Sequence, residues 1–131
     1  MAEHYTVCVG AGSLVIDDGH AMDHPWTGAG VTFDASFSGA HLLHLAVAGC
    51  VLNSVYREAE VRGQTLRGVR VTARGAFDAD TWFSPGIEYD VAVDSALKDD
   101  EVESLIARAG ELAEIPRTLG NATPVSRVHG G

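Results

Sequence analysis

The feature that most constrains this chain is one long apolar segment, residues 38–63, which reads SGAHLLHLAVAGCVLNSVYREAEVRG. Apolar or small side chains recur along it at steps of three and four, which is the spacing of one helix face. Hydrophobic residues also occupy its other faces as far as Val55, so we expect this helix to be buried nearly all round. Ser38 is a suitable N-cap and Gly63 a suitable C-terminal stop.

The segments outside this helix alternate as strands do. In LRGVRVTARGAFD, residues 66–78, one face of the strand carries Val69, Val71 and Ala73. GIEYDVAVDSAL, residues 86–97, alternates in the same way, and such alternation is typical of antiparallel strands with one solvated face. We expect further strands in HYTVCVGAGSLVID, VTFDASF and PVSRVHG, and a second helix in KDDEVESLIARAGELAEI that ends before Pro116.

Together these elements predict a fold of the α+β class, with an antiparallel sheet around one long central helix. At 131 residues the chain is long enough for one domain. We divide that single domain, residues 1–131, into three parts: N-terminal strands and a loop at 1–37, the central helix at 38–63, and the sheet, second helix and last strand at 64–131.

Charge limits the partners that this chain can have. Eighteen acidic and nine basic residues give a net charge of −9, which argues against nucleic acid or an anionic membrane. No apolar run reaches the roughly 18 residues of a membrane span, because His41, His44 and Asn53 interrupt the best candidate. The N-terminus lacks the basic start of a signal peptide, so we expect a cytoplasmic protein with no membrane partner.

Cys50 lies near the middle of the apolar helix, and composition and spacing favour a structural cysteine there. Free cysteine is among the most buried residue types, and apolar burial makes a thiol inert. Residues 1–56 contain no Lys or Arg, so the local cation is Arg57, which shares the face of Cys50 but lies about 10 Å along the axis. The second cysteine, Cys8, leaves too few thiols for a disulfide scaffold.

Metal binding is the other chemistry that these residue types suggest. His41 and His44 share a helix face, but Cys50 lies about 180° and 120° around the helix from them, so one straight helix cannot bring all three to one ion. The loop GHAMDHPW offers a weaker set of possible ligands, His20, Asp23 and His24. We expect no metal site and no cofactor.

Several motifs in order resemble the OsmC/Ohr family. LLHLAVAGCVLNSVYREAEVRGQTLRGVRVTARGAF is similar to that family's central helix, connector and strands, and PRTLGNATPV to its ending. The resemblance covers roughly residues 38–128. It implies an intertwined homodimer with two long central helices packed between β-sheets, and it implies a thiol peroxidase that reduces organic hydroperoxides with one attacking and one resolving cysteine.

Carried over residue by residue, the resemblance is incomplete. The attacking cysteine matches Cys50, whereas Ala40 stands at the family's glutamate and Ala113 at its resolving cysteine. The family's arginine belongs to the N-terminal region, where this chain has none. A standard two-cysteine peroxidase is therefore not expected, although Cys8 is a possible substitute for the resolving thiol.

Two functions stay open at this point. One is a degenerate one-cysteine thiol peroxidase, or a redox sensor for organic hydroperoxides, with Cys50 as the attacking thiol and His41, His44 or Arg57 as possible helpers. The other is a non-catalytic protein that binds a small apolar ligand in the dimer-interface pocket, with Trp82 and Phe83 among the lining residues.

Overall fold

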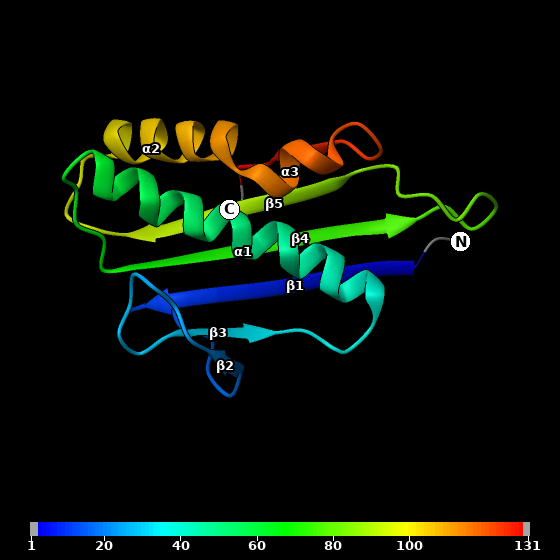
Figure 1. The fold of residues 1–131 in the computed structure, drawn as a ribbon, viewed down its shortest axis with the longest axis horizontal. Coiled ribbons are helices and arrows are strands. Elements are labelled where there is room, and N and C mark those ends of the chain that lie inside the picture. Colours follow the sequence, from blue (N-terminus) through cyan, green and yellow to red (C-terminus); the bar gives the residue numbers. More distant parts are fainter. Residues whose placement is uncertain (1–2, 130–131) are drawn as a thin grey trace.

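The computed structural model describes residues 3–129. Six strands and three helices follow one another along the chain (Figure 1), in the order β1(Glu3–Gly12), β2(His20–Met22), β3(Val31–Asp34), α1(Gly39–Val61), β4(Gly68–Phe77), β5(Ile87–Asp94), α2(Asp99–Leu112), α3(Glu114–Leu119) and β6(Val125–Arg127). The α+β class predicted from the sequence is confirmed, with α1 as its long helix.

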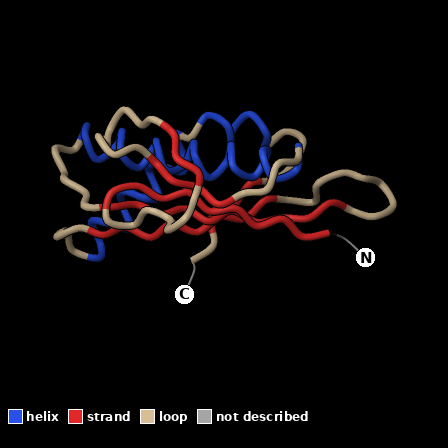
Figure 2. Tube along the Cα trace, turned by 90° about the horizontal axis from the view of Figure 1, so that it is seen from below, coloured by secondary structure: helices blue, strands red, loops and turns tan. Residues whose placement is uncertain are grey.

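All six strands belong to one sheet, which forms a single twisted layer (Figure 2) in the order β2-β3-β1-β4-β5-β6. The strands from β2 to β5 pair antiparallel, as predicted. The last pair departs from the predicted antiparallel sheet, because β6 runs parallel to β5 with Tyr89 opposite Arg127. The chain returns to the sheet edge through two helices, and such a crossover allows parallel pairing.

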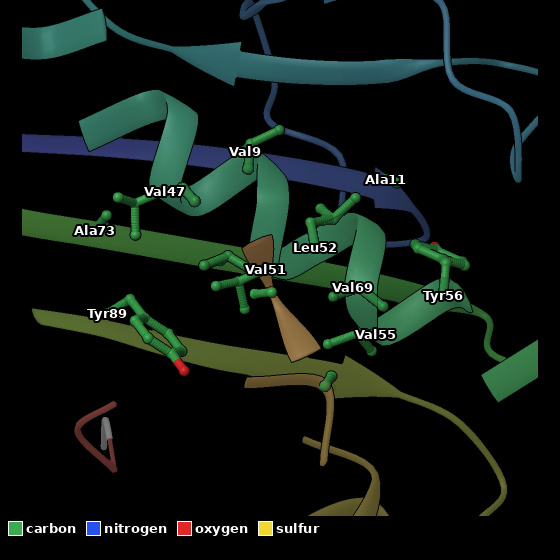
Figure 3. Packing of buried hydrophobic residues seen from close by; sticks show 14 of the residues in the cluster. Val9, Ala11, Val47, Val51, Leu52, Val55, Tyr56, Val69, Ala73 and Tyr89 are labelled. Carbon is green, nitrogen blue, oxygen red and sulfur yellow. The ribbon is translucent and has the colours of Figure 1, made fainter. Parts of the chain in front are cut away.

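The hydrophobic core lies between α1 and the two central strands. Val47, Val51 and Val55 of α1 are fully buried (Figure 3), and they belong to one cluster with the inward side chains of β1 and β4, which are Val7, Val9, Ala11, Val69, Val71 and Ala73. The alternation predicted for β4 is therefore confirmed. Burying one such valine stabilises the fold by about 1.5 kcal/mol or more relative to exposing it.

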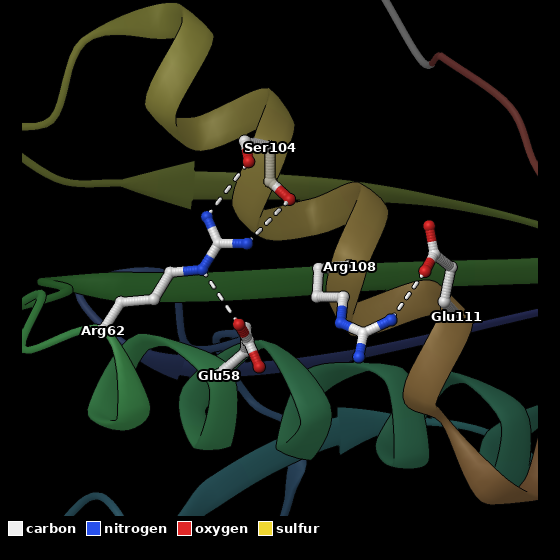
Figure 4. Close-up of polar contacts among 5 residues, drawn as sticks. All are labelled: Glu58, Arg62, Ser104, Arg108 and Glu111. Atoms are coloured by element: carbon white, nitrogen blue, oxygen red, sulfur yellow. Dashed lines mark hydrogen bonds and ion pairs between the residues drawn. The ribbon is translucent and has the colours of Figure 1, made fainter.

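Both ends of α1 have the stop signals that the sequence predicts. The Ser38 hydroxyl accepts a hydrogen bond from the His41 backbone N–H at 3.1 Å, and Gly63 takes a left-handed φ of 68° just past the last turn. The guanidinium of Arg62 then contacts Glu58 at 2.9 Å and the Ser104 hydroxyl of α2 at 3.1 Å (Figure 4). The C-terminal end of α1 is thereby joined to α2.

The second helix differs from the prediction of one helix ending before Pro116. It ends at Leu112, Ala113 is extended with φ −66° and ψ 115°, and α3 then begins at Glu114. Pro116 lies in the first turn of α3, where its missing N–H costs no helical hydrogen bond. The break matters because it directs the start of α3 toward α1.

We expected His41, His44 and Asn53 to leave no apolar run long enough for a membrane span. By length and composition alone, however, α1 is long and apolar enough to cross a membrane. The core helix of a globular fold satisfies the same criterion. Here the valine face of α1 is buried against the sheet and not left for lipid.

Candidate functional site

The thiol of Cys50 lies where α1 meets the start of α3. Its Sγ donates a hydrogen bond to Oε1 of Glu114 at 3.1 Å and accepts one from the backbone N–H of Ile115 at 3.4 Å. The cysteine is half-buried. The thiol is thus held in one orientation beside a carboxylate that is exposed to solvent.

Arg57 completes this cluster from α1. Its Nη2 lies 3.5 Å from Oε1 of Glu114, the same oxygen that accepts the thiol hydrogen bond. Seven residues separate Arg57 from Cys50, so both face the same side of the helix two turns apart. The guanidinium therefore acts on the sulfur through the carboxylate.

The charges in this cluster favour a protonated thiol and an ionised acid. Burial raises the pKa of the Cys50 thiol above its ordinary value, and the hydrogen bond and negative charge of Glu114 raise it further, against the opposing N–H of Ile115. The pKa of Glu114 is lowered by its own backbone N–H, by the thiol and by Arg57. At neutral pH the sulfur is consequently a protonated, poor nucleophile next to an ionised carboxylate.

The other cysteine lies elsewhere in the chain. Val7 and Val9 of β1 point into the core, so Cys8 between them points to the opposite face of the sheet. Its thiol is 3.4 Å from the hydroxyl of Thr72 on the neighbouring strand. Within residues 3–129 the sheet therefore separates the two thiols of one chain.

The two helix histidines lie near the start of α1, apart from the thiol cluster. Both rings pack on Tyr5, at centroid distances of 5.0 Å for His41 and 5.9 Å for His44. Nδ1 of His44 donates to a backbone carbonyl one turn earlier at 2.7 Å, and Nδ1 of His41 is 2.6 Å from the Ser38 hydroxyl. Cys50 comes six residues after His44, about 9 Å along the axis.

The loop that contains His24 is held against α1 by hydrogen bonds. His24 lies 2.8 Å from the Thr27 hydroxyl and 2.9 Å from Oδ1 of Asn53, so it fastens the loop to α1. Over residues 3–129 no three His, Cys, Asp or Glu side chains group as metal ligands would.

Trp82 and Phe83 lie on the connection between β4 and β5, and both are largely exposed. They do not line the apolar cleft of about 280 Å³ near the start of α1, whose lining residues are His20, Phe33, Ala35, Ser36, Phe37 and Leu42. An apolar cleft beside α1 thus exists, but its aromatic residues come from β3 and the segment before α1.

Glu114 is the site residue that the sequence reasoning missed. The resemblance had already aligned Ala113 with the resolving cysteine, which places this stretch of chain next to Cys50. Ala113 is fully buried, and the residue after it supplies the carboxylate. The sequence therefore did hold a signal for Glu114, because it directly follows Ala113, the position aligned with the resolving cysteine.

The family described as OsmC-like protein matches residues 32–127. The chain belongs to the OsmC-like family. Among curated proteins no match is found.

Solved structures of OsmC-like proteins share the fold. An organic hydroperoxide resistance protein OsmC from Legionella pneumophila has a TM-score of 0.62 at 20% identity, covering 74% of this chain and 72% of that one. An OsmC-like protein from Mycoplasma pneumoniae has a TM-score of 0.65 at 14% identity, covering 74% and 73%. An OsmC-like hydroperoxide resistance protein from Jannaschia sp. has a TM-score of 0.60 at 19% identity, covering 89% and 87%.

Proposed function

We propose that this OsmC-like protein is a one-cysteine redox protein in which Cys50 reacts with organic hydroperoxides. The observation that carries the proposal is the half-buried thiol of Cys50 on the central helix, which is hydrogen-bonded to Glu114, the ion-pair partner of Arg57. Two similar structures are of proteins named for hydroperoxide resistance. The family membership and this local chemistry support the same assignment.

The carboxylate gives the reaction a path for its proton. Glu114 takes the thiol proton as general base, and the thiolate of Cys50 attacks one peroxide oxygen. The O–O bond breaks, the sulfur becomes a sulfenic acid, and the leaving alkoxide receives the proton from Glu114 as an alcohol. An external thiol then condenses with the sulfenic acid, releasing water, and a second thiol reduces the mixed disulfide.

The rate of the first step is limited by the protonation of the sulfur. Because the pKa of Cys50 is raised, a small fraction of the protein carries a thiolate at neutral pH. We infer a slow peroxidase or a sensor that accumulates sulfenic acid, in preference to a fast detoxifying enzyme. The cytoplasm, where low-molecular-weight thiols are abundant, supplies a reductant for this cycle.

The test is to expose the protein to cumene hydroperoxide and trap sulfenic acid with dimedone. We expect one adduct, at Cys50, in the wild type and in Cys8→Ser, and none in Cys50→Ser. Consumption of the hydroperoxide with dithiothreitol as reductant measures turnover. A Cys50 that stays unmodified at pH 8, while the denatured chain reacts, would overturn the proposal.

Ligand binding without catalysis is the second candidate, and the apolar cleft beside Leu42 favours it. Phe33 and Phe37 contribute aromatic surface there, and Phe37 is 92% exposed. A small apolar ligand covering these side chains would remove them from water. Retention of ligand-induced thermal stabilisation by Cys50→Ala, and its loss in Phe37→Ser, would identify this function.

We also propose that the chain forms a homodimer through α1. The side of α1 that faces away from the sheet carries Leu42 and Ala46, which are exposed, and Gly49, above which a Cβ would meet nothing within 4 Å. A second central helix packed on this strip would bury it, as the family resemblance implies. Light scattering should give about twice the 13.8 kDa chain mass, and Ala46→Arg should reduce it to the monomer value.

A further inference from the structure

Two exposed aromatic side chains lie on the connection between β4 and β5. Trp82 is 76% exposed and Phe83 is 78% exposed, and we call this pair the aromatic tip. The connection that carries the pair extends beyond the helices in both views of the molecule (Figure 1, Figure 2). Neither ring belongs to the hydrophobic core of residues 3–129, so both rings are left in contact with water.

Hydrogen bonds hold the aromatic tip in one conformation. Oδ1 of Asp78 accepts the backbone N–H groups of Asp80 and Thr81, at 2.8 Å and 2.9 Å. The backbone N–H of Asp78 donates to the carbonyl of Phe83, and its carbonyl accepts from Trp82, each at 2.9 Å. Trp82 itself has a left-handed φ of 62°, which is unfavourable for a bulky side chain and is typical of functional positions. The strain is retained although neither ring is buried within the chain.

The apolar cleft near the start of α1 is a hollow surface that fits this tip. Its lining includes Phe33, Phe37 and Leu42, and Phe37 is 92% exposed. Its volume of about 280 Å³ lies below the roughly 300 Å³ at which pockets for drug-sized ligands begin, so it suits a single aromatic group. Trp82 and Phe83 do not line the cleft of their own chain, so a tip that fills it belongs to a second copy.

The tip and the cleft lie at the same end of the molecule. Figure 1 shows the connection between β4 and β5 and the first turn of α1 together at the right of the view. In a two-fold dimer every contact occurs twice, so the tip of each chain can meet the cleft of the other. Leu42 belongs both to the cleft and to the exposed strip of α1 that we assign to the homodimer, so the contact would extend that interface.

The area of these side chains matches what a stable dimer needs. Burying a Trp or Phe side chain removes about 150–250 Å² from water. With Trp82, Phe83 and Phe37 from each of two chains, the rings alone remove roughly 1,000 Å², which is about the lower limit for a specific interface. Tryptophan is also among the residues that most often carry the binding energy of an interface.

The charge around the tip argues against a membrane surface as its partner. Asp78 and Asp80 flank the two rings, and the chain carries a net charge of −9, so anionic lipid would repel this end of the molecule. The cleft has one titratable residue among those that line it, His20. The cleft of a second copy therefore offers the rings an apolar surface without a repelling acid.

We propose that the aromatic tip of each chain inserts into the apolar cleft of its partner. The indole of Trp82 packs against the partner's Phe37, and the cleft then has no room for the small apolar ligand considered as the second candidate function. This inference rests on the homodimer proposed above and adds the contact through which the two chains hold each other.

Disulfide cross-linking tests which surfaces meet. Two full-length chains that carry Cys8→Ser and Cys50→Ser are prepared, one with Trp82→Cys and the other with Phe37→Cys, and they are mixed and treated with oxidised glutathione. We expect a disulfide-linked pair that contains one chain of each kind. Val61→Cys is the matched control, because Val61 is also 76% exposed but lies at the other end of α1, and it should form no bridge with Trp82→Cys.

Trp82→Gly separates a role in the interface from a role in the fold. Glycine accepts the left-handed φ without strain, so the melting temperature of the dilute, monomeric chain should not fall. The dissociation constant of the dimer, measured by sedimentation, should rise at least about tenfold. Val61→Ser removes an exposed apolar side chain outside the proposed contact and should leave that constant unchanged.

The outcomes distinguish this contact from the homodimer on which it rests. A wild-type chain that stays monomeric at millimolar concentration would overturn both. A dimer that forms no bridge between Trp82→Cys and Phe37→Cys, or that Trp82→Gly does not weaken, would overturn this inference alone. Binding of indole to the cleft of the intact dimer, seen as shifts of the Phe37 and Leu42 signals, would assign the cleft to a small ligand instead.

Discussion

The thiol of Cys50 donates its hydrogen bond to Glu114, 64 residues later in the chain, at a distance of 3.1 Å. A carboxylate at this distance keeps the sulfur protonated, because a thiolate there would face a second negative charge. In the reaction that we propose, the same carboxylate accepts the proton of the thiol. We therefore expect Glu114 to disfavour the thiolate before the reaction and to accept its proton during attack.

Alkylation of Cys50 should therefore depend steeply on pH. The pKa of the thiol is raised above its ordinary value, so the thiolate fraction should grow about tenfold per unit between pH 7 and pH 9 with no plateau in that range. Iodoacetamide kinetics on Cys8→Ser, read by mass spectrometry, measure this dependence. A rate that levels off below pH 8 would contradict the predicted direction of the shift.

Replacing Glu114 by Gln should lower the pKa of Cys50. The substitution removes the negative charge that disfavours the thiolate and releases the guanidinium of Arg57. We expect alkylation at pH 7.5 to be several-fold faster than in the wild type, with a pH profile moved to lower pH. Glu111→Gln is the control for charge, and a rate unchanged by Glu114→Gln would show that the carboxylate does not act on the sulfur.

Restoring a cysteine at Ala113 should supply a resolving thiol. Its neighbours in sequence, Glu114 and Ile115, both contact the sulfur of Cys50, so a thiol one or two residues away comes within reach of a disulfide after small adjustments. Peroxide treatment of Ala113→Cys should produce an intrachain bridge to Cys50, detected by peptide mapping. Ala109→Cys, one turn earlier on α2 and equally buried, should not form it.

Acid should weaken the attachment of β6 to α2. Arg127 donates two hydrogen bonds to Glu103, at 3.0 Å and 2.8 Å, and lowers the pKa of that carboxyl to about 2. A lowered folded-state pKa contributes stability above the ordinary pKa of glutamate, and this contribution is lost as pH falls from about 5 toward 2. Glu103→Gln should flatten the stability profile in that window, as measured by urea unfolding.

The sequence predicted the parts of this fold in which one face is buried. Val69 and Val71 alternate with polar residues because one side of β4 packs on α1, and Ser38 and Gly63 mark the helix ends by local chemistry. A three-residue strand such as β6 is too short for its sequence pattern to indicate whether it pairs parallel or antiparallel. Its parallel pairing depends on how α2 and α3 return the chain.

The candidate site was predictable in part. Cys50 and the side of the helix shared with Arg57 follow from spacing, since both are fixed by the helical repeat. Glu114 does not follow, because its position depends on the break at Ala113, and Pro116 suggested a helix end three residues too late. Long-range contacts set by such a break carry no local signature.

The extended backbone at Ala113 has a consequence for how chemistry can vary on this scaffold. The break between α2 and α3 determines which of the consecutive side chains faces the sulfur. An insertion or deletion of one residue there would place an alanine or an isoleucine where the acid stands, and it would also displace the fully buried Ala113 from the core. Through such a change of length, the residue that faces the thiol can therefore change only together with the packing of the core at this break.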